Sequence, residues 1–239
     1  MSIPVNDIPL EELLKQYQGR ALSQEEISSY ERWSLDFFHN KAFVNEPNLQ
    51  MTLQLDITEA LKTYKDQYNN VPEASFTAYL MWHLVQTMKS HPAFRYRKIG
   101  DQWYLFDNLP LFSPIAIGGD IRFTEITVDN VAGDPPKDFF KNYRLAIKES
   151  KNRDAFSPLP PSVWATAHFV GNLPNLQFTG FSLHTPAKSS GRPYFYFGKR
   201  YNQEERQFIP LLITFDHSNL DPFLLSAFMA DFEKNIQSP

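Results

Sequence analysis

The first strand that the sequence predicts is marked by an alternation of apolar and polar residues. Met51, Leu53 and Leu55 are apolar, and Thr52 and Gln54 between them are polar. A period of two places alternate side chains on opposite faces of a sheet, so this strand has one buried face. Residues 209–215 are apolar almost throughout, which indicates a more deeply buried strand. Further strands are expected at residues 94–99, 102–106, 112–117, 121–128, 165–170, 176–183 and 193–199.

Helical spacing of apolar residues predicts the remaining elements. Residues 76–88 are apolar nearly all round, which is typical of a buried helix. Other helices are expected to begin at residues 56–59, at 134–136 and after Pro222. Helices and strands alternate irregularly, which favours an α/β (α+β) fold. We expect a two-layer sandwich, in which helices pack on a mixed central β-sheet.

The first 29 residues are predicted to form an extension to this fold. Leu10, Leu13 and Tyr17 have a short helical spacing that Gly19 interrupts. Residues 23–26 have the polar residue and glutamate of a capping box, so a second helix is expected to begin there. We therefore expect an N-terminal extension at residues 1–29 and a single domain at residues 30–239.

Composition limits the kinds of partner. The net charge is −4 and no block of Lys or Arg stands out, so nucleic acid is not an expected partner. No apolar run approaches the roughly 18–20 residues of a membrane span, and the N-terminus is not a signal peptide. The absence of cysteine excludes disulfides and thiolate chemistry, and a cytoplasmic location is expected. Aromatic residues make up 15%, which suggests either aromatic-lined pockets and large interfaces or a heavy β-sheet core.

Common catalytic motifs are missing from the sequence. Gly118-Gly119 lacks the Lys-Ser/Thr pair of a phosphate-binding loop, and no Gly-x-Ser-x-Gly sequence occurs. The six histidines are scattered, and no two have the spacing of metal ligands on a helix. No metal is therefore expected.

The strongest candidate for chemistry is His217. It follows the buried strand at 209–215, and Asp221 lies four residues further on. A buried strand that carries an imidazole to its end, close to a carboxylate, can hold a neutral base at a cleft. A structural interpretation is also open, in which Asp221 and Pro222 are the N-cap and first residue of a helix and His217 is a hydrogen-bonded loop residue.

The segment Asp216-His217-Ser-Asn-Leu-Asp221-Pro222 resembles the His-His-x-x-x-Asp-Gly motif of the chloramphenicol acetyltransferase family, within the coenzyme A-dependent acyltransferase superfamily. The resemblance extends along the chain from residue 30 in an ordered series. The matching segments are Tyr30-Glu-Arg32, Leu55-Asp-Ile-Thr58, Phe94-Arg95, Asn172-Leu-Pro174 and the stretch from Pro193 to Lys199.

The resemblance implies a mechanism and an assembly. His217 would be the general base that removes a hydroxyl proton from an acceptor while the oxygen attacks acetyl-CoA, the co-substrate. Asp221 would pair with Arg32 as a structural support. The family is a homotrimer, in which one subunit supplies the histidine and its neighbour most of the acceptor pocket. Membership also implies a cytoplasmic enzyme and, for chloramphenicol as acceptor, antibiotic resistance.

The resemblance also predicts binding residues and shows departures from the family. The first family histidine is Asp216 here, and the glycine that follows the family aspartate is Pro222. The serine that hydrogen-bonds the tetrahedral intermediate is Gly171, and a tyrosine of the substrate pocket is His39. Lys199 aligns with a lysine at the coenzyme A end of the channel. The expected acceptor-site residues are Phe38, His39, Phe123, Gly171, Asn172, Asn175 and Tyr196.

These residues favour an acetyl-CoA-dependent O-acetyltransferase that acts on chloramphenicol or another small hydroxyl-bearing acceptor. A second hypothesis is a catalytically impaired family member that binds a small ligand or has a regulatory role, which Gly171, Asp216 and Pro222 motivate. A third is the acyltransferase core of a 2-oxo acid dehydrogenase complex. The absence of a lipoyl-type domain or flexible linker counts against the third hypothesis.

Overall fold

A mixed β-sheet forms the centre of the protein, seen in a computed structural model that describes residues 7–120, 122–151, 159–184 and 190–238. Within these residues the sheet has seven strands in the order β2-β10-β8-β7-β5-β6, with β9 beside β10. β7 is parallel to β5 and β8, and the other pairs are antiparallel, so the predicted mixed sheet is confirmed. The strands are β2 (Asn48–Asp56), β5 (Leu111–Gly118), β6 (Arg122–Val128), β7 (His168–Asn172), β8 (Tyr194–Phe197), β9 (Tyr201–Gln203) and β10 (Arg206–Asp216).

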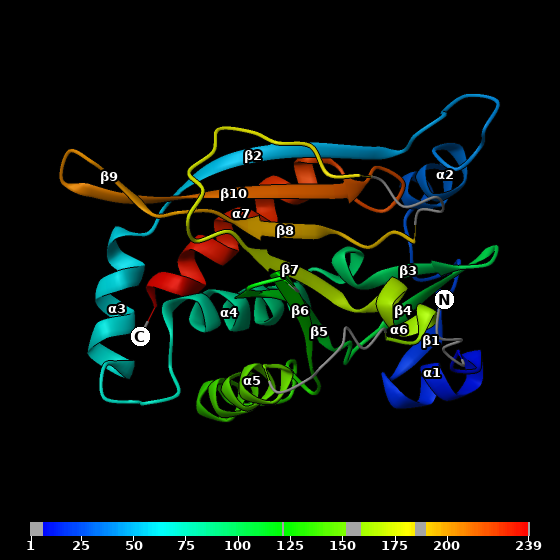
Figure 1. Cartoon of the computed structure of the whole chain (residues 1–239). Helices are drawn as coiled ribbons and strands as arrows, with labels where there is room; N and C mark the ends of the chain where they lie inside the picture. Colours follow the sequence, from blue (N-terminus) through cyan, green and yellow to red (C-terminus); the bar gives the residue numbers. More distant parts are fainter. Residues whose placement is uncertain (1–6, 121, 152–158, 185–189, 239) are drawn as a thin grey trace.

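Four helices, α3 (Thr58–Tyr68), α4 (Phe76–Ser90), α5 (Pro136–Ser150) and α7 (Pro222–Gln237), pack on the sheet and enclose the main core (Figure 1). Strand alternation decides which side chains join this core. In β8, Phe195 and Phe197 are 1% exposed and belong to the main core, whereas Tyr194 and Tyr196 pack with a separate cluster on the opposite face. None of the helices in the described residues is long and apolar enough to span a membrane.

The N-terminal segment packs onto the rest of the chain. β1 (Gly19–Ala21) pairs with β4 (Gln102–Phe106), which also pairs with β3 (Tyr96–Ile99) after the short helix η1 (Pro92–Arg95). From α1 (Leu10–Gln16) and the residue after it, Leu13 and Tyr17 join a small core with Phe106, Leu109 and Val163, the last from α6 (Pro161–Thr166). Residues 10–21 therefore add a helix and an edge strand to the fold.

The strand predicted at residues 176–183 is wrong, because this segment has no strand pairing. It crosses the sheet face opposite the helices, where polar side chains of β2 bind its backbone. The side-chain N–H of Gln50 donates to the carbonyl of Phe181. The side-chain oxygen of Gln50 accepts from the backbone N–H of Leu183 at 3.2 Å. Gln54 donates to the carbonyl of Phe178 at 3.4 Å. Side chains thus satisfy backbone groups that a strand would pair.

Two further local predictions need correction. The helix expected to begin at residues 23–26 is α2 (Ser29–Phe37), and its capping box is formed by Ser28 and Glu31. Residues 165 and 166 belong to α6, so the strand expected at 165–170 begins only at His168. Ile121, expected as the first residue of its strand, lies outside the described residues, and β6 begins at Arg122.

Candidate active site

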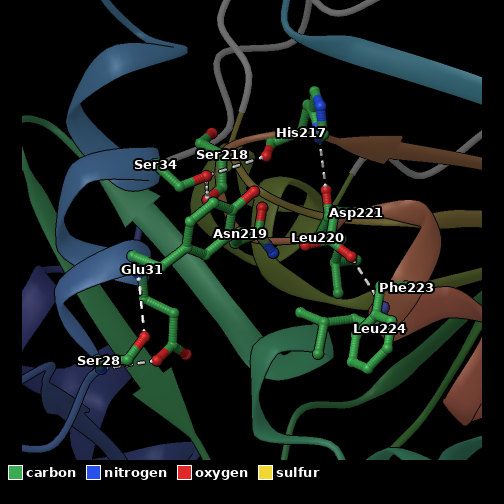
Figure 2. A pocket seen from close by; sticks show the side chains of 11 residues that line it. Ser28, Glu31, Ser34, His217, Ser218, Asn219, Leu220, Asp221, Phe223 and Leu224 are labelled. Carbon is green, nitrogen blue, oxygen red and sulfur yellow. Dashed lines mark hydrogen bonds between the residues drawn. The ribbon is translucent and has the colours of Figure 1, made fainter.

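His217 lies directly after β10, at the end of the most buried strand of the sheet. Its backbone N–H donates to the carbonyl of Pro47 at 2.8 Å, and its ring Nδ1 lies 3.1 Å from the carbonyl oxygen of Leu220 (Figure 2). A carbonyl oxygen only accepts, so Nδ1 is the donor of this bond, and in the neutral ring the lone pair is on Nε2. The ring is half-buried and lines a cavity of about 350 Å³ between α2 and the start of α7. This is the tautomer that a general base needs.

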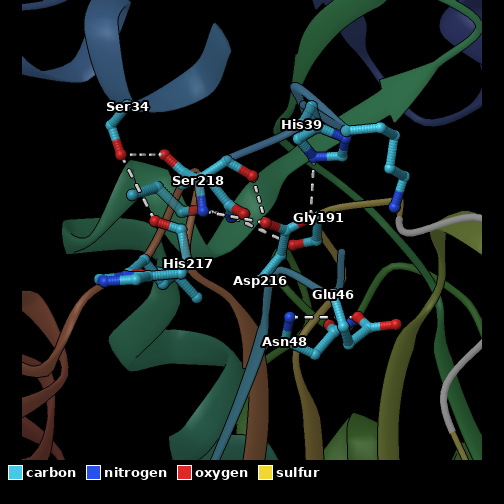
Figure 3. Close-up of polar contacts among 12 residues, drawn as sticks. Ser34, His39, Glu46, Asn48, Gly191, Asp216, His217 and Ser218 are labelled. Carbon is cyan, nitrogen blue, oxygen red and sulfur yellow. Dashed lines mark hydrogen bonds and ion pairs between the residues drawn. The ribbon is translucent and has the colours of Figure 1, made fainter. Parts of the chain in front are cut away.

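The turn that carries His217 is held by the segment that ends α2 (Figure 3). The hydroxyl of Ser34 donates to the carbonyl of Ser218 at 2.9 Å, and the ring of Phe38 lies 4.1 Å from the ring of His217. His39 Nε2 lies 3.0 Å from the carboxylate of Asp216, which is fully buried. His39, expected in the acceptor site, contacts the loop beside the candidate base.

Asp221 is the N-cap of α7, because its carboxylate accepts from the backbone N–H of Leu224 at 2.8 Å. This matches the structural interpretation of the Asp221-Pro222 pair. The expected pairing with Arg32 is absent from the described residues. Arg32 is exposed and donates to the carbonyls of Gln24 and Ile27, at 2.6 and 2.9 Å. Arg32 instead binds the turn that precedes its own helix.

An aromatic pocket of about 580 Å³ opens on the sheet face opposite the main core. Tyr194 and Tyr196 of β8 and Phe169 of β7 point toward it because they share one alternation of adjacent strands. Trp164 of α6 forms another part of the wall. The hydroxyl of Tyr196 makes no hydrogen bond within the described part of the chain. We call this cavity the aromatic pocket.

The wall of the aromatic pocket is fixed by a buried arginine, Arg192. Its guanidinium carbon lies 4.4 Å from the ring centres of both Trp164 and Tyr194, and one of its nitrogens donates to the hydroxyl of Tyr194 at 2.6 Å. Arg192 also donates to the carbonyl of Trp164, while Ser190 and Arg97 donate to the next two carbonyls of α6. The last carbonyls of this short helix are thereby satisfied, and cations lie at its negative end.

Burial lowers the pKa values of the basic side chains Arg97, His168 and Arg192. Desolvation, followed by the charge of Arg192, holds the pKa of Arg97 well below its usual range. Desolvation also lowers the pKa of Arg192, and it places the pKa of His168 well below 6.5 with a further contribution from Arg97. His168 is therefore neutral at physiological pH.

Gly171 has no room for a side chain. It pairs with Tyr196 across β7 and β8, and a Cβ atom at 171 would lie 2.2 Å from Cε1 of the Tyr196 ring. Gly171 thus contributes no hydroxyl or other side-chain donor. The phenol of Tyr196 takes the space beside it.

A third cavity, of about 670 Å³, is lined by polar and basic groups and lies at the opposite end of β10 from His217. Lys65, Lys199 and Arg200 supply positive charge to it. Asn172 also lines it, and its side-chain amide lies 3.4 Å from the hydroxyl of Thr77. We call this cavity the basic pocket. It brings together Lys199 and Asn172, two residues that the sequence had singled out.

Of the predicted acceptor-site residues, Asn172 and Tyr196 line one of these cavities, whereas Phe38, His39, Gly171, Phe123 and Asn175 do not. Phe123 lies on β6 with 51% of its surface exposed, and Asn175 is exposed in the turn after β7. Among the described residues, no group of three or more His, Asp or Glu side chains is placed to hold a metal ion.

Within one chain the three cavities are separate. No described residue lines more than one of them. Ile209 lines the basic pocket, and Asp216, next to His217, is seven residues further along β10, which is roughly 23 Å in an extended strand. The aromatic pocket and the basic pocket lie on opposite faces of the sheet.

The fold places a histidine directly after the last strand of a mixed sheet that helices cover, and the comparisons with known proteins assign this arrangement to an acyltransferase class. The family model for chloramphenicol acetyltransferase matches residues 23–233. The chain therefore belongs to the chloramphenicol acetyltransferase family.

Individual relatives are distant but cover almost the whole chain. The chloramphenicol acetyltransferase of Staphylococcus aureus is 22% identical over 216 residues, which is 87% of this chain and 94% of the relative. That of Klebsiella sp is 24% identical over 219 residues, or 88% and 95%. These relatives support an acyltransferase.

Solved structures show the same fold. A chloramphenicol acetyltransferase superposes with a TM-score of 0.76 at 20% identity, covering 91% of this chain and 99% of that one. The dihydrolipoamide acetyltransferase of Azotobacter vinelandii has a TM-score of 0.61 at 15% identity, with 98% of both chains covered. The predicted fold class and family are confirmed.

Several residues around these cavities were missed by sequence reasoning. Arg97 and Arg192 read as ordinary charged residues near strands, and only their burial shows their role. Tyr194 could have been found, because it is two residues from Tyr196 in a predicted strand and therefore shares its face. Trp164 gave no signal, because no element was predicted for residues 161–164 and only the last two residues of its helix fell in a predicted strand.

Proposed function

We propose that this protein is an acetyl-CoA-dependent O-acetyltransferase that acts on a small hydroxyl-bearing acceptor, with His217 as general base. The observation that carries the proposal is the contact between Nδ1 of His217 and the carbonyl of Leu220. In the neutral ring this contact leaves the lone pair on Nε2, on a side chain fixed at the end of a buried strand. Family membership supplies the reaction class.

In the proposed reaction, Nε2 of His217 takes the proton from the acceptor hydroxyl. The hydroxyl oxygen forms a bond to the thioester carbonyl carbon of acetyl-CoA, which gives a tetrahedral intermediate with a negative oxygen. The carbon–sulfur bond then breaks, and the proton on His217 passes to the departing thiolate. The products are the acetyl ester and coenzyme A, and no acyl-enzyme is required.

The negative oxygen of the intermediate needs a hydrogen-bond donor, which the family serine supplies and Gly171 does not. We assign this role to the hydroxyl of Tyr196. Its ring fills the space beside Gly171, and its hydroxyl has no partner in the described residues. Burial raises the pKa of Tyr196 above its ordinary value of 10, so the phenol keeps its proton at physiological pH.

The aromatic pocket is the proposed site of the acceptor. Its wall of Trp164, Phe169, Tyr194 and Tyr196 favours a molecule with an apolar or aromatic body. Chloramphenicol is one candidate acceptor, and another small alcohol is equally compatible with this lining. For chloramphenicol the biological role would be antibiotic resistance.

The basic pocket is the proposed site of the co-substrate. Acetyl-CoA carries phosphate groups, and Lys65, Lys199 and Arg200 offer complementary charge around the cavity. The polar lining of this cavity contrasts with the apolar lining of the aromatic pocket. Each pocket thus suits one of the two substrates.

The separation of the cavities supports an assembly in which copies of the chain complete one another's sites. We propose a homotrimer, as the family resemblance implies, with His217 of one subunit facing the aromatic pocket of its neighbour. A soluble cytoplasmic enzyme is part of this proposal. Light scattering on the purified protein tests the assembly, and a monomer with full activity would contradict it.

The function is tested by release of the coenzyme A thiol from acetyl-CoA, with chloramphenicol and a panel of small alcohols and amines. Wild type is compared with His217→Ala and with a matched control, His91→Ala, whose side chain lies near α7 and away from the three cavities. We expect acceptor-dependent release in wild type and in the control, and none above background in His217→Ala. Equal rates in all three proteins would exclude His217 as the base.

The second candidate function is binding without catalysis. Two observations favour it: Gly171 brings no side-chain donor, and the expected Arg32–Asp221 pair is absent from the described residues. It predicts that calorimetry detects acceptor or coenzyme A binding while thiol release stays at background. Activity of the wild type in the thiol assay would exclude it.

A further inference from the structure

Two departures from the family pattern, at positions 39 and 216, meet in one contact. His39 stands where the family has a tyrosine, and Asp216 where the family has its first histidine. In this chain Nε2 of His39 lies 3.0 Å from Oδ2 of Asp216 (Figure 3). Two positions at which this chain departs from the family motif thus contact each other at the base of the turn that carries His217.

The carboxylate of Asp216 organises this turn. Asp216 is 0% exposed, and a buried carboxylate needs donors to offset its lost hydration. One oxygen accepts from the backbone N–H of Ser218 at 2.9 Å and from the Ser218 hydroxyl, while the other accepts from His39. The residues directly before and after His217 are thereby tied to each other and to His39.

His39 is itself held in place. Its side chain is 15% exposed, and its ring packs edge-on against Trp103 with the centres 5.5 Å apart. Its neighbour Phe38 places a ring 4.1 Å from the ring of His217. A shift of the 38–39 backbone would therefore disturb both the imidazole of His217 and the turn that carries it.

We propose that His39 and Asp216 form a positioning pair that fixes the imidazole of His217 for catalysis. The pair keeps the turn closed, so that Nδ1–H of His217 stays on the carbonyl of Leu220 and Nε2 stays free. The catalytic part of this proposal rests on the proposed role of His217 as base. The positioning of the ring can be measured without turnover.

The chain offers a matched control for this pair. Nε2 of His91 lies 2.8 Å from the carboxylate of Asp231, and the His91 side chain is 14% exposed, almost as for His39. His91→Leu therefore removes a histidine–carboxylate contact that involves no residue of the His217 turn, with the difference that Asp231 is 56% exposed and Asp216 is buried. His39→Leu removes one donor to Asp216, and His39→Gln restores a side-chain N–H that can reach the carboxylate.

We expect His39→Leu to lower kcat about 10- to 100-fold with little change in the KM for acetyl-CoA, because a small misplacement of a reacting group costs this much. His39→Gln should recover part of the loss, and His91→Leu should leave kcat unchanged. In the double variant that combines His39→Leu with Asp216→Asn, the loss of activity, expressed as a free energy, should be well below the sum of the two single losses. An equal loss in His39→Leu and His91→Leu overturns the proposal, and so does an unchanged kcat in His39→Leu.

Ring ¹⁵N chemical shifts of His217, assigned with His217→Gln, provide the readout that a merely structural role would not move. We expect one tautomer, protonated at Nδ1, in wild type and in His91→Leu, and a mixture of tautomers in His39→Leu. An unmixed wild-type signal in a folded His39→Leu overturns the proposal. If His39→Leu does not fold, the ring ¹⁵N shifts of His217 in Asp216→Asn are compared with those in wild type and His91→Leu. A wild type with the expected ring signal but no turnover on any acceptor refutes the proposed function and leaves this inference standing.

Discussion

The ring of Tyr196 occupies the space that a side chain at Gly171 would need, because a Cβ atom there would lie 2.2 Å from Cε1 of the ring. The two residues face each other in register across β7 and β8. Where the family has a serine this chain has Gly171, and its lack of a side chain leaves room for the ring of Tyr196 on the next strand. A serine cannot be restored at position 171 without moving this ring.

Gly171→Ser is expected to lower both stability and activity. Overpacking of a close contact costs about 1–3 kcal/mol, and the displaced Tyr196 ring would enter the aromatic pocket. Adding Tyr196→Thr should recover most of the stability, because it removes the clashing ring. Urea unfolding and thiol release measure the two effects.

Gly180→Ser is the control for this prediction. A Cβ at Gly180 would meet only the hydroxyl of Thr52, at 3.8 Å, so its unfolding free energy should stay within about 0.5 kcal/mol of wild type. Equal destabilisation by the two serine substitutions would show that the Tyr196 contact does not decide the outcome.

Tyr196→Phe removes a hydroxyl and keeps the ring. If that hydroxyl stabilises the intermediate, kcat should fall about 10²- to 10³-fold while the KM values change little. Steady-state kinetics with the best acceptor measure this. An unchanged kcat would assign the donor role to another group, such as a backbone amide.

Arg192→Leu should loosen the wall of the aromatic pocket. It leaves the carbonyl of Trp164 and the hydroxyl of Tyr194 without their donor, which costs about 2–3 kcal/mol of unfolding free energy. The KM for the acceptor should rise more than that for acetyl-CoA. Arg192→Lys should restore little, because an ammonium group does not stack between two rings as a planar guanidinium does.

The comparison for Arg192 is Arg206→Leu. The side chain of Arg206 is 70% exposed and pairs with Asp56 at 3.4 Å, so its loss should change stability by less than about 0.5 kcal/mol. The denaturant midpoints of Arg192→Leu and Arg206→Leu measure the two changes in stability. Equal midpoints would mean that the buried arginine does not stabilise α6.

His83 should make the protein less stable in mild acid. Burial lowers the pKa of His83 to about 4, whereas in the unfolded chain it is about 6.5. As the pH falls from about 6.5 toward 4, the unfolded state binds a proton that the native state excludes, so the unfolding free energy decreases. Above about pH 7.5 the residue is almost entirely neutral in both states and contributes little pH dependence.

His83→Phe isolates this contribution, since phenylalanine keeps a ring against Tyr79 and Trp82. We expect its unfolding free energy to fall less than that of wild type between pH 6.5 and 4, by about 1–3 kcal/mol. Chemical denaturation at a series of pH values measures the difference. Parallel curves for the two proteins would contradict the role of His83.

Elements with a strong local pattern could be predicted from the sequence. The alternation around Leu53 and Leu55 gave β2, and the apolar helix expected at 76–88 is α4. The prediction failed at residues 176–183, which are apolar enough for a strand. There the side chains of Gln50 and Gln54, more than 120 residues away in the sequence, take up the backbone groups.

The candidate site also contains residues that a local sequence pattern predicts and residues that only the fold brings together. His217 was recognisable because a local apolar strand carries it to its end. The contact of His39 with Asp216 joins residues 177 apart, and no local pattern in the sequence encodes it. For Asp221 the sequence left two interpretations open, a carboxylate that supports the base and the N-cap of a helix. The hydrogen bond from the backbone N–H of Leu224 to its carboxylate matches the N-cap interpretation.

The short strand β1 has a practical consequence for handling the protein. It covers one edge of β4, whose buried residues include Trp103 and Phe106, and an uncovered strand edge of this kind recruits other chains. The family match begins at residue 23, just after β1. Expression of residues 23–239, which keeps all of α7, should therefore yield protein that aggregates through β4, while residues 1–239 should remain dispersed.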